Sequence, residues 1–253
     1  MALNIQQLCA DPTRTHKPRG YGLTHVLDKG LWVAEVRSLP EVAAPYVGIV
    51  KFGWATPAVV RNLTAEIERL RASGIDVCCG GSLFELAVSQ RKLDEYVSFL
   101  KDHGSESVEV SDGVIELELL EKCRDIEKLA KDFRGLSEVG SKDAKVVVAP
   151  FRWVAQIKSE LAAGAWKVVT EGRESGTVGL YRESGEIRTG LIEEIEVEID
   201  PKRLIFEAPQ KAQQVWLVKH FGNNVNLGNI PPQEVISVET IRQGLRADTM
   251  LDR

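Results

Sequence analysis

Hydrophobic residues follow two alternating patterns along the whole chain. Short runs that are apolar at consecutive positions and rich in β-branched residues predict buried strands. These runs cover residues 23–28, 46–52, 75–80, 107–111, 135–139, 166–172, 203–208 and 223–228. Between them lie longer segments in which apolar residues recur at helical spacing, which predicts amphipathic helices. These segments cover residues 57–73, 84–103, 119–132, 151–163, 209–221 and 232–243.

The alternation predicts an α/β fold of the (β/α)8 TIM-barrel type. Eight strands, each followed by a helix or a loop, suit a closed barrel, and such barrels typically have ~250 residues. A doubly wound open sheet is the alternative, but it usually carries a G-x-G-x-x-G loop after its first strand, where this chain reads LDKGLW (27–32). We therefore expect one barrel domain over residues 1–253, with residues 1–22 as an N-terminal extension. The irregular segment 172–190 is expected to be a loop on the catalytic face.

Composition and charge narrow the class of protein. With 43% hydrophobic and 27% charged residues, the chain has the make-up of an ordinary globular protein. Its net charge of −5 and its lack of a dense lysine and arginine cluster argue against a nucleic-acid partner. No segment approaches the ~20 apolar residues of a membrane span, and the first twenty residues are too polar for a signal peptide. We expect a cytoplasmic protein with no membrane association.

The cysteines and histidines do not form a recognisable metal or disulfide motif. The cysteines are Cys9, Cys78, Cys79 and Cys123. They lack C-x-x-C spacing, so we expect reduced thiols. The four histidines are scattered along the chain, which argues against a zinc hydrolase.

Ionisable and amide side chains gather where the predicted strands end. In (β/α)8 barrels the active site is formed at the carboxyl ends of the strands. The polar residues at these positions include Lys29, Lys51, Glu85, Glu109, Ser111, Glu138, Lys142, Glu171, Arg173, Glu207, Gln210, Lys211, Asn226 and Asn229. Charges that converge in a barrel mouth must be paired, bound to metal or used on a ligand, so a structural ion-pair network is the alternative to an active site.

The mixture of polar groups indicates the kind of ligand. Carboxylate and amide oxygens suit Mg²⁺, whereas lysine and arginine suit phosphate, carboxylate or sulfite. Together they predict a small anionic substrate held with a divalent cation. Gly222 and Gly228, near the last strand, fit either a backbone-lined phosphate site or ordinary turns.

Nine segments, taken in order, resemble the phosphosulfolactate synthase family. They are GLTHVLDKGL (22–31), VKFGWAT (50–56), GGSLFE (80–85), VEVSDG (108–113), SEVG (137–140), EGRESG (171–176), IFEAPQKAQQ (205–214), FGNNVNLGNI (221–230) and EVISVETIRQGLRADT (234–249). The resemblance implies a barrel lyase that uses Mg²⁺ to add sulfite to phosphoenolpyruvate. The product would be (2R)-2-phospho-3-sulfolactate, an early intermediate of coenzyme M biosynthesis. The family usually reads E-V-G-K-K after the fifth strand, where this chain has Ser141 and Lys142, so one of two lysines is absent.

Roles for the site residues follow from this resemblance. A general acid must protonate the phosphate-bearing carbon, and we expect Lys142 in that role, with Lys29 and Lys51 as alternatives. Arg173 is expected to hold the phosphate or the incoming sulfite. The expected metal ligands are Glu138, Glu171 and Glu207. The residues expected to orient substrate oxygens are Ser111, Gln210, Lys211, Asn226 and Asn229.

Two other functions are compatible with the sequence. A Schiff-base barrel aldolase would use Lys51 or Lys29 as an amine nucleophile. A catalytically divergent or non-enzymatic protein is the second, because plant heat-stress-associated proteins also resemble this family. Four tryptophans on the predicted outer helices or rims are candidates either for a homo-oligomer interface or for core packing. They are Trp32, Trp153, Trp166 and Trp216.

Overall fold

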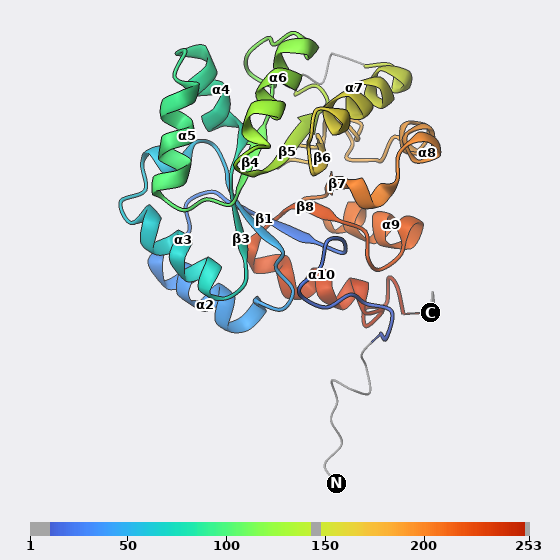
Figure 1. Ribbon diagram of the computed structural model, residues 1–253. Helices are drawn as coiled ribbons and strands as arrows, with labels where there is room; N and C mark the ends of the chain where they lie inside the picture. The colour runs from blue at the N-terminus through green and yellow to red at the C-terminus, as the bar shows by residue number, and fades with distance from the viewer. Residues whose placement is uncertain (1–10, 143–147, 251–253) are drawn as a thin grey trace.

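Eight parallel strands close into a barrel in chain order in the computed structural model, which describes residues 11–142 and 148–250 (Figure 1). The strands are β1 (Thr24–Asp28), β2 (Ile49–Phe52), β3 (Asp76–Cys79), β4 (Ser107–Val110), β5 (Arg134–Val139), β6 (Lys167–Thr170), β7 (Leu204–Glu207) and β8 (Leu227–Ile230). The last strand pairs with the first, with Thr24 opposite Leu227. The predicted (β/α)8 barrel is thus confirmed.

Helices surround this barrel (Figure 1). They are α2 (Val33–Ala43), α3 (Leu63–Ala72), α4 (Gly81–Ser89), α5 (Leu93–Asp102), α6 (Leu119–Leu129), α7 (Pro150–Ala162), α8 (Thr189–Glu198), α9 (Lys211–Phe221) and α10 (Val235–Arg242). Short 3₁₀ turns are η1 (Thr56–Ala58), η2 (Pro201–Arg203) and η3 (Pro232–Glu234). None of the helices in the described ranges has the length and apolar character that crossing a membrane requires.

Several predicted boundaries are wrong, each for a local reason. The predicted helix 84–103 is two helices, because Arg91 adopts a left-handed backbone with φ of 59° between α4 and α5. Helix α2 was not predicted, because proline normally argues against a helix and Pro40 lies in its interior. Helix α8 was also missed, since it begins inside the segment whose composition predicts a loop. The last strand lies at Leu227–Ile230 rather than at 223–228, because Val225 N–H bonds to Gly222 O in a turn.

Strand alternation divides the apolar residues into an inner and an outer core. Successive side chains of a strand point to opposite faces, so every second residue enters the barrel. One inner layer comprises Leu23, Ile49, Cys78, Leu136, Val169 and Ile205. Outward residues such as Val50, Val168 and Leu204 pack with the surrounding helices. Trp153 belongs to this outer core, whereas Trp32 is exposed. Cys78, Cys79 and Cys123 are free thiols, and Cys9 lies outside the described residues.

Candidate active site

A layer of charged side chains lies directly above the inner apolar layer, at the carboxyl ends of the strands. Because side chains alternate between the two faces of a strand, the residue two positions further along the strand again points into the barrel. In this way Lys51, Glu138, Glu171 and Glu207 follow Ile49, Leu136, Val169 and Ile205. These four charged groups line a cavity of about 270 Å³ together with Glu109 of β4. These five charged groups, all noted at the predicted strand ends, therefore line one cavity.

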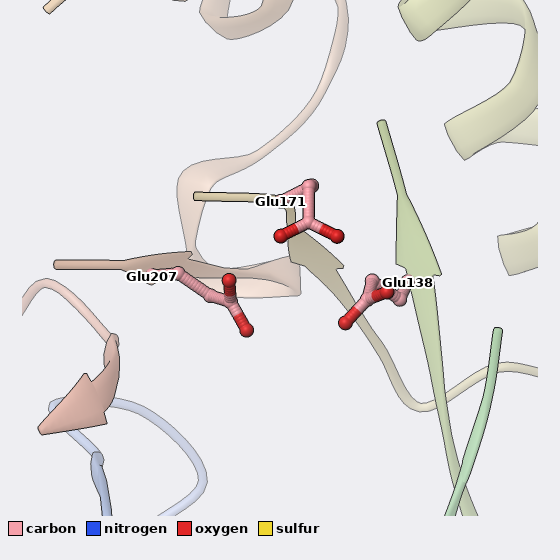
Figure 2. Close-up of side chains that lie close together, drawn as sticks. All are labelled: Glu138, Glu171 and Glu207. Carbon is pink, nitrogen blue, oxygen red and sulfur yellow. The ribbon is translucent and has the colours of Figure 1, made fainter. Parts of the chain in front are cut away.

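Glu138, Glu171 and Glu207 form a buried acidic triad that could hold a metal ion. One carboxylate oxygen from each lies within 4.8 Å of the others, and Figure 2 shows the three side chains turned toward a common point. Oε2 of Glu171 is buried and has no hydrogen-bond partner among the described residues. Burial, followed by the charges of Glu138 and Glu207, raises the pKa of Glu171 well above its ordinary value. A cation at this point would relieve the repulsion and supply the missing partner.

Lys51 crosses the floor of the cavity and neutralises part of this charge. Its Nζ lies 3.1 Å from Oε2 of Glu109 and 3.3 Å from Oε1 of Glu207. Burial alone would lower the pKa of Lys51, but the carboxylates of Glu109, Glu207 and Glu138 raise it well above its ordinary value. Lys51 is therefore a buried ammonium ion and not a neutral amine.

Lys142 approaches the triad from the opposite side. Its Nζ lies 2.8 Å from Oε1 of Glu138, 3.9 Å from Oε2 of Glu171 and 3.8 Å from Oε1 of Glu85. Burial opposes the charge, but Glu138 and Glu171 raise the pKa of Lys142, so it too is an ammonium ion. In return, Lys142 and Lys51 outweigh the effect of burial on Glu138 and lower its pKa to about 2.

Two carboxylates that were noticed in the sequence but given no role hold the walls of the cavity. Oε1 of Glu109 accepts a hydrogen bond from Gly81 N–H at 2.9 Å, which fixes the start of α4. Glu85 accepts the Ser111 hydroxyl and the backbone N–H groups of residues 113–115, which fixes the loop after β4. Strand parity could have identified Glu109, because it is an inward position of β4. The role of Glu85 depends on the conformation of the loop after β4, which no sequence pattern predicts.

Arg173 and Asn229, both predicted site residues, line the cavity in left-handed backbone conformations. Arg173 has φ of 56° and an exposed side chain at the mouth, and its N–H donates to Oε1 of Glu171 at 2.7 Å. Asn229 has φ of 52°, and its Oδ1 is buried without a hydrogen-bond partner among the described residues. Strained backbone of this kind gathers at functional sites. Both side chains are thus available to a ligand.

Other predicted residues lie at the edge of the cavity or support it. Ser111 is buried and donates to Glu85. Gln210 does not line the cavity, and its Nε2 donates to Ser175 O at 2.6 Å in the loop that carries Arg173. Lys29 is exposed, with its Nζ 5.3 Å from the ring centroid of Trp54. Trp54 itself lines the mouth of the cavity, a position that the sequence analysis did not single out.

Lys211 and Asn226 are not brought to the cavity. Lys211 is half exposed and pairs with Asp248, with its Nζ 2.8 Å from Oδ2. Asn226 precedes β8 and lies at the opposite end of the barrel, where its side chain bonds to Leu23 N–H and Leu204 O. Gly222 also precedes β8, so it does not form a phosphate site at the carboxyl ends. Asn226 and Gly222 were misplaced because the last strand begins later than predicted, whereas Lys211 follows β7 as expected and its side chain pairs with Asp248 instead.

Comparison with known proteins agrees first with the class of protein that the fold defines, a (β/α)8 barrel. The barrel resembles the YdjI aldolase from Escherichia coli K12 (TM-score 0.57, 10% identity, 88% of this chain and 86% of that one). It also resembles 3-hexulose-6-phosphate synthase from Salmonella typhimurium (TM-score 0.56, 16% identity, 87% and 97% covered). At these identities the likeness concerns the fold alone.

The chain belongs to the (2R)-phospho-3-sulfolactate synthase (ComA) family, whose model matches residues 12–248. It is 42% identical to the phosphosulfolactate synthase of Methanothermobacter thermautotrophicus, covering 94% of this chain and 95% of that one. It is 40% identical to that of Bacillus subtilis, covering 94% and 96%. It is 43% identical to that of Methanocaldococcus jannaschii, covering 90% and 93%. The predicted family is therefore confirmed, and with it the prediction of a lyase.

Proposed function

We propose that this enzyme adds sulfite to phosphoenolpyruvate with the help of Mg²⁺, giving (2R)-2-phospho-3-sulfolactate for coenzyme M biosynthesis. The observation that carries the proposal is the buried acidic triad with an ammonium group on either side, at the catalytic end of a barrel of this family. The partners of the enzyme are then two small anions. We place the reaction in the cytoplasm, in keeping with the free thiols of the described cysteines.

The donor set suits Mg²⁺ better than softer metals. Glu138, Glu171 and Glu207 offer only oxygen atoms, and Oε2 of Glu171 accepts no hydrogen bond from the described residues, which leaves it ready to bind a metal ion. When bound there, Mg²⁺ would neutralise negative charge that develops on the substrate carboxylate. The remaining chemistry falls to the side chains of the chain itself.

The reaction needs a nucleophile that the protein does not have to make. The sulfur lone pair of sulfite forms the new C–S bond at the methylene carbon, and the electrons of the carbon–carbon double bond move onto the carboxylate. The resulting enediolate is then protonated at the phosphate-bearing carbon. We assign that proton to Nζ of Lys142, which is an ammonium ion on one side of the triad. Lys51, on the floor beneath Glu109 and Glu207, would stabilise the negative charge.

Arg173 and Asn229 would bind the peripheral oxygens of the substrates. The Arg173 guanidinium stands at the mouth, where it can meet a phosphate or the incoming sulfite as a bidentate donor. The buried Asn229 side chain would donate from its Nδ2 group to a substrate oxygen, while its Oδ1, which has no donor among the described residues, would accept from a protonated group of the ligand. The Ser82 hydroxyl also lines the cavity beside the start of α4.

The state of Lys51 bears on the alternative of a Schiff-base aldolase. Imine formation requires a neutral amine, usually produced by a lowered pKa. The pKa of Lys51 is instead raised by Glu109 and Glu207. Borohydride reduction in the presence of a carbonyl substrate should therefore leave no adduct on Lys51, and a trapped adduct would favour the aldolase.

The proposed reaction can be followed by phosphorus NMR. Phosphoenolpyruvate, sulfite and MgCl₂ are mixed with the enzyme, with and without EDTA. A new phosphate ester should appear only with sulfite and metal, and no free phosphate should be released. Unchanged phosphoenolpyruvate under these conditions would sink the proposal and favour a divergent, non-catalytic member of the family. Lys142→Ala should abolish the new signal, while Lys158→Ala on the surface should not.

A further inference from the structure

A second cavity, of about 630 Å³, lies at the end of the barrel opposite to the catalytic site. Its lining residues stand at or just before the starts of strands, among them Leu23, Gly48, Asp76, Glu106 and Arg134. The catalytic cavity is lined instead by residues at the strand ends. The two cavities are therefore separated by the inner apolar layer of the barrel.

Positive charge is in excess in this second cavity. Its lining includes four cationic side chains (Lys17, Arg19, Arg71 and Arg134) and two carboxylates (Asp76 and Glu106), in a chain whose net charge is −5. Arg71 pairs with Glu106, and Arg134 pairs with Asp76 through Nη1 and Oδ2 at 2.8 Å. Two of the four cations are thus left without a carboxylate.

Lys17 and Arg19 are these two uncompensated cations. Nζ of Lys17 donates to Gly74 O at 2.7 Å, and Arg19 donates to the carbonyls of Thr15, Pro45 and Tyr46. Neither forms an ion pair with another described residue. Burial and the charge of Arg19 lower the pKa of Lys17 to about 8, which reflects the lack of a neutralising partner. Nε of Arg19 is in addition buried without an acceptor among the described residues.

Asp76 adds a hydrogen-bond acceptor to this cationic cavity. Its Oδ2 accepts from Ser107 and Arg134, but its Oδ1 is buried and has no donor among the described residues. A ligand that satisfies both Arg19 and Asp76 must present an acceptor to the first and a donor to the second. Inorganic phosphate can do so, because it keeps at least one proton throughout the neutral range, and a phosphate monoester can do so in the monoanionic form that it takes below a pKa of about 6, whereas sulfate carries no proton.

We propose that this cavity is a second anion site, selective for phosphate or a small phosphate monoester, with Lys17 and Arg19 as the charge partners and Asp76 as the acceptor that distinguishes phosphate from sulfate. The planar Arg71 and Arg134 groups at the rim offer further donors. Arg134 is itself held over the ring of Trp166, with its Cζ 4.7 Å from the centroid. The site is thus positioned to sense phosphate compounds without touching the catalytic residues.

The test uses isothermal titration calorimetry on the full chain with inorganic phosphate and with sulfate, at pH 6.5, constant ionic strength and in EDTA. Wild type should bind phosphate at this site at least tenfold more tightly than sulfate. The double variant Lys17→Gln/Arg19→Gln should lose about tenfold or more in phosphate affinity, because two charge-assisted contacts disappear. Lys128→Gln/Lys158→Gln, which makes the same charge change on exposed helix faces, should bind phosphate as wild type does.

Two further variants keep the inference open to refutation if the double variant does not fold. Arg71→Gln changes a half-exposed rim residue and should weaken phosphate binding while the circular dichroism spectrum is unchanged. Asp76→Asn should reduce the preference for phosphate over sulfate, because the acceptor becomes a donor. Equal phosphate affinity in wild type and in Lys17→Gln/Arg19→Gln or Arg71→Gln would overturn the proposal. So would wild-type binding of sulfate as tight as that of phosphate. The assay contains neither phosphoenolpyruvate, sulfite nor metal, and phosphate that binds instead at Arg173 in the catalytic cavity would keep its wild-type affinity in Lys17→Gln/Arg19→Gln.

Discussion

The charge of Glu171 is only partly balanced within the protein, by Nζ of Lys142 at 3.9 Å from its Oε2. Its carboxyl group is buried beside Glu138 and Glu207, and one of its oxygens accepts no hydrogen bond from the described residues. Glu171→Gln should therefore lower turnover by roughly 10²-fold, since a charged group at the reacting centre is lost. The same change should leave the metal-free enzyme as stable as wild type or about 1 kcal/mol more stable, because repulsion is reduced.

Chemical denaturation in EDTA and turnover in Mg²⁺ measure these two effects separately. Glu193→Gln, an exposed position of α8, is the matched control and should change neither quantity. A Glu171→Gln enzyme that loses both stability and activity would show that Glu171 is part of a structural ion-pair network, the alternative that the sequence left open.

His25 makes a different prediction at the scale of a single residue. It is fully buried in β1, both ring nitrogens lack hydrogen-bond partners among the described residues, and burial and then Lys51 lower its pKa well below 6.5. Below pH 6.5 the unfolded chain takes up a proton that the folded chain refuses. The folding stability from this residue is therefore complete above pH 6.5 and lost as the pH falls, by about 1.4 kcal/mol per pH unit.

His25→Gln should remove this dependence. Unfolding free energies of wild type and variant, measured between pH 7.5 and 5, should converge or cross as the pH falls, with the steeper line belonging to wild type. Parallel lines would mean that His25 is protonated in the folded enzyme.

The inward residues of the strands were predictable, and the residues around them were not. Alternation along a strand places Lys51, Glu138 and Glu207 inside the barrel whatever the rest of the chain does. Asn226 was misplaced because a shift in the start of β8 moves a side chain from one end of the barrel to the other. Glu85 acts through the loop after β4, and that contact depends on tertiary structure alone.

At the scale of secondary-structure elements, a fully buried lysine joins α6 to the strands that carry the site. Nζ of Lys122 lies 3.0 Å from Oδ1 of Asp112, 2.6 Å from Glu138 O and 2.9 Å from Oε1 of Glu160. Lys122→Met leaves Glu160 buried without its partner and should lower the unfolding free energy by about 3–5 kcal/mol. Adding Glu160→Leu should restore most of that stability.

Activity should not recover with stability in the double variant. The Glu138 carbonyl still lacks its donor, so the carboxylate beside Lys142 is held less firmly, and we expect turnover roughly tenfold below wild type. The comparison is made by denaturant titration and by the phosphorus NMR assay. Full recovery of turnover in Lys122→Met/Glu160→Leu would show that Lys122 acts through stability alone.

The loop after β4 depends on Glu85 in a similar way. Three backbone N–H groups of residues 113–115 point at its carboxylate, and the loop passes so close to Lys142 that a β-carbon on Gly113 would overlap Cδ of that side chain. Glu85→Gln should weaken these charge-assisted bonds, raise KM about tenfold and speed amide hydrogen exchange at residues 113–115. Exchange at wild-type rates with normal KM would remove Glu85 as a positioning residue.

Helices were predicted less well than strands for a physical reason. A strand of this barrel is buried on both faces and therefore stands in a short run of mostly apolar residues, whereas a helix covers the barrel with one face and tolerates breakers where it meets solvent. Arg91 breaks the predicted helix 84–103 without a proline or glycine to announce it, and Pro40 lies inside a real helix.

At the scale of the whole molecule, we expect the carboxyl ends of the strands to carry catalysis and the opposite end of the barrel to contribute mainly to stability. At the end opposite to the triad, buried Arg14 donates to both carboxylate oxygens of Glu239 and to Gly22 O at 2.9 Å, and so ties the N-terminal segment to α10. Arg14→Leu leaves Glu239 buried and unpaired, and should lower the unfolding free energy by about 3 kcal/mol. Turnover of the folded fraction at 20 °C should stay at the wild-type value, because the inner apolar layer separates Arg14 from the catalytic cavity.

Denaturant titration and turnover on one preparation check both statements, and Arg14→Leu/Glu239→Leu should recover the lost stability. A fall in turnover of fully folded Arg14→Leu enzyme would mean that the two ends communicate through the strands, and that an anion bound among Lys17, Arg19 and Asp76 could then act on the chemistry at the other end.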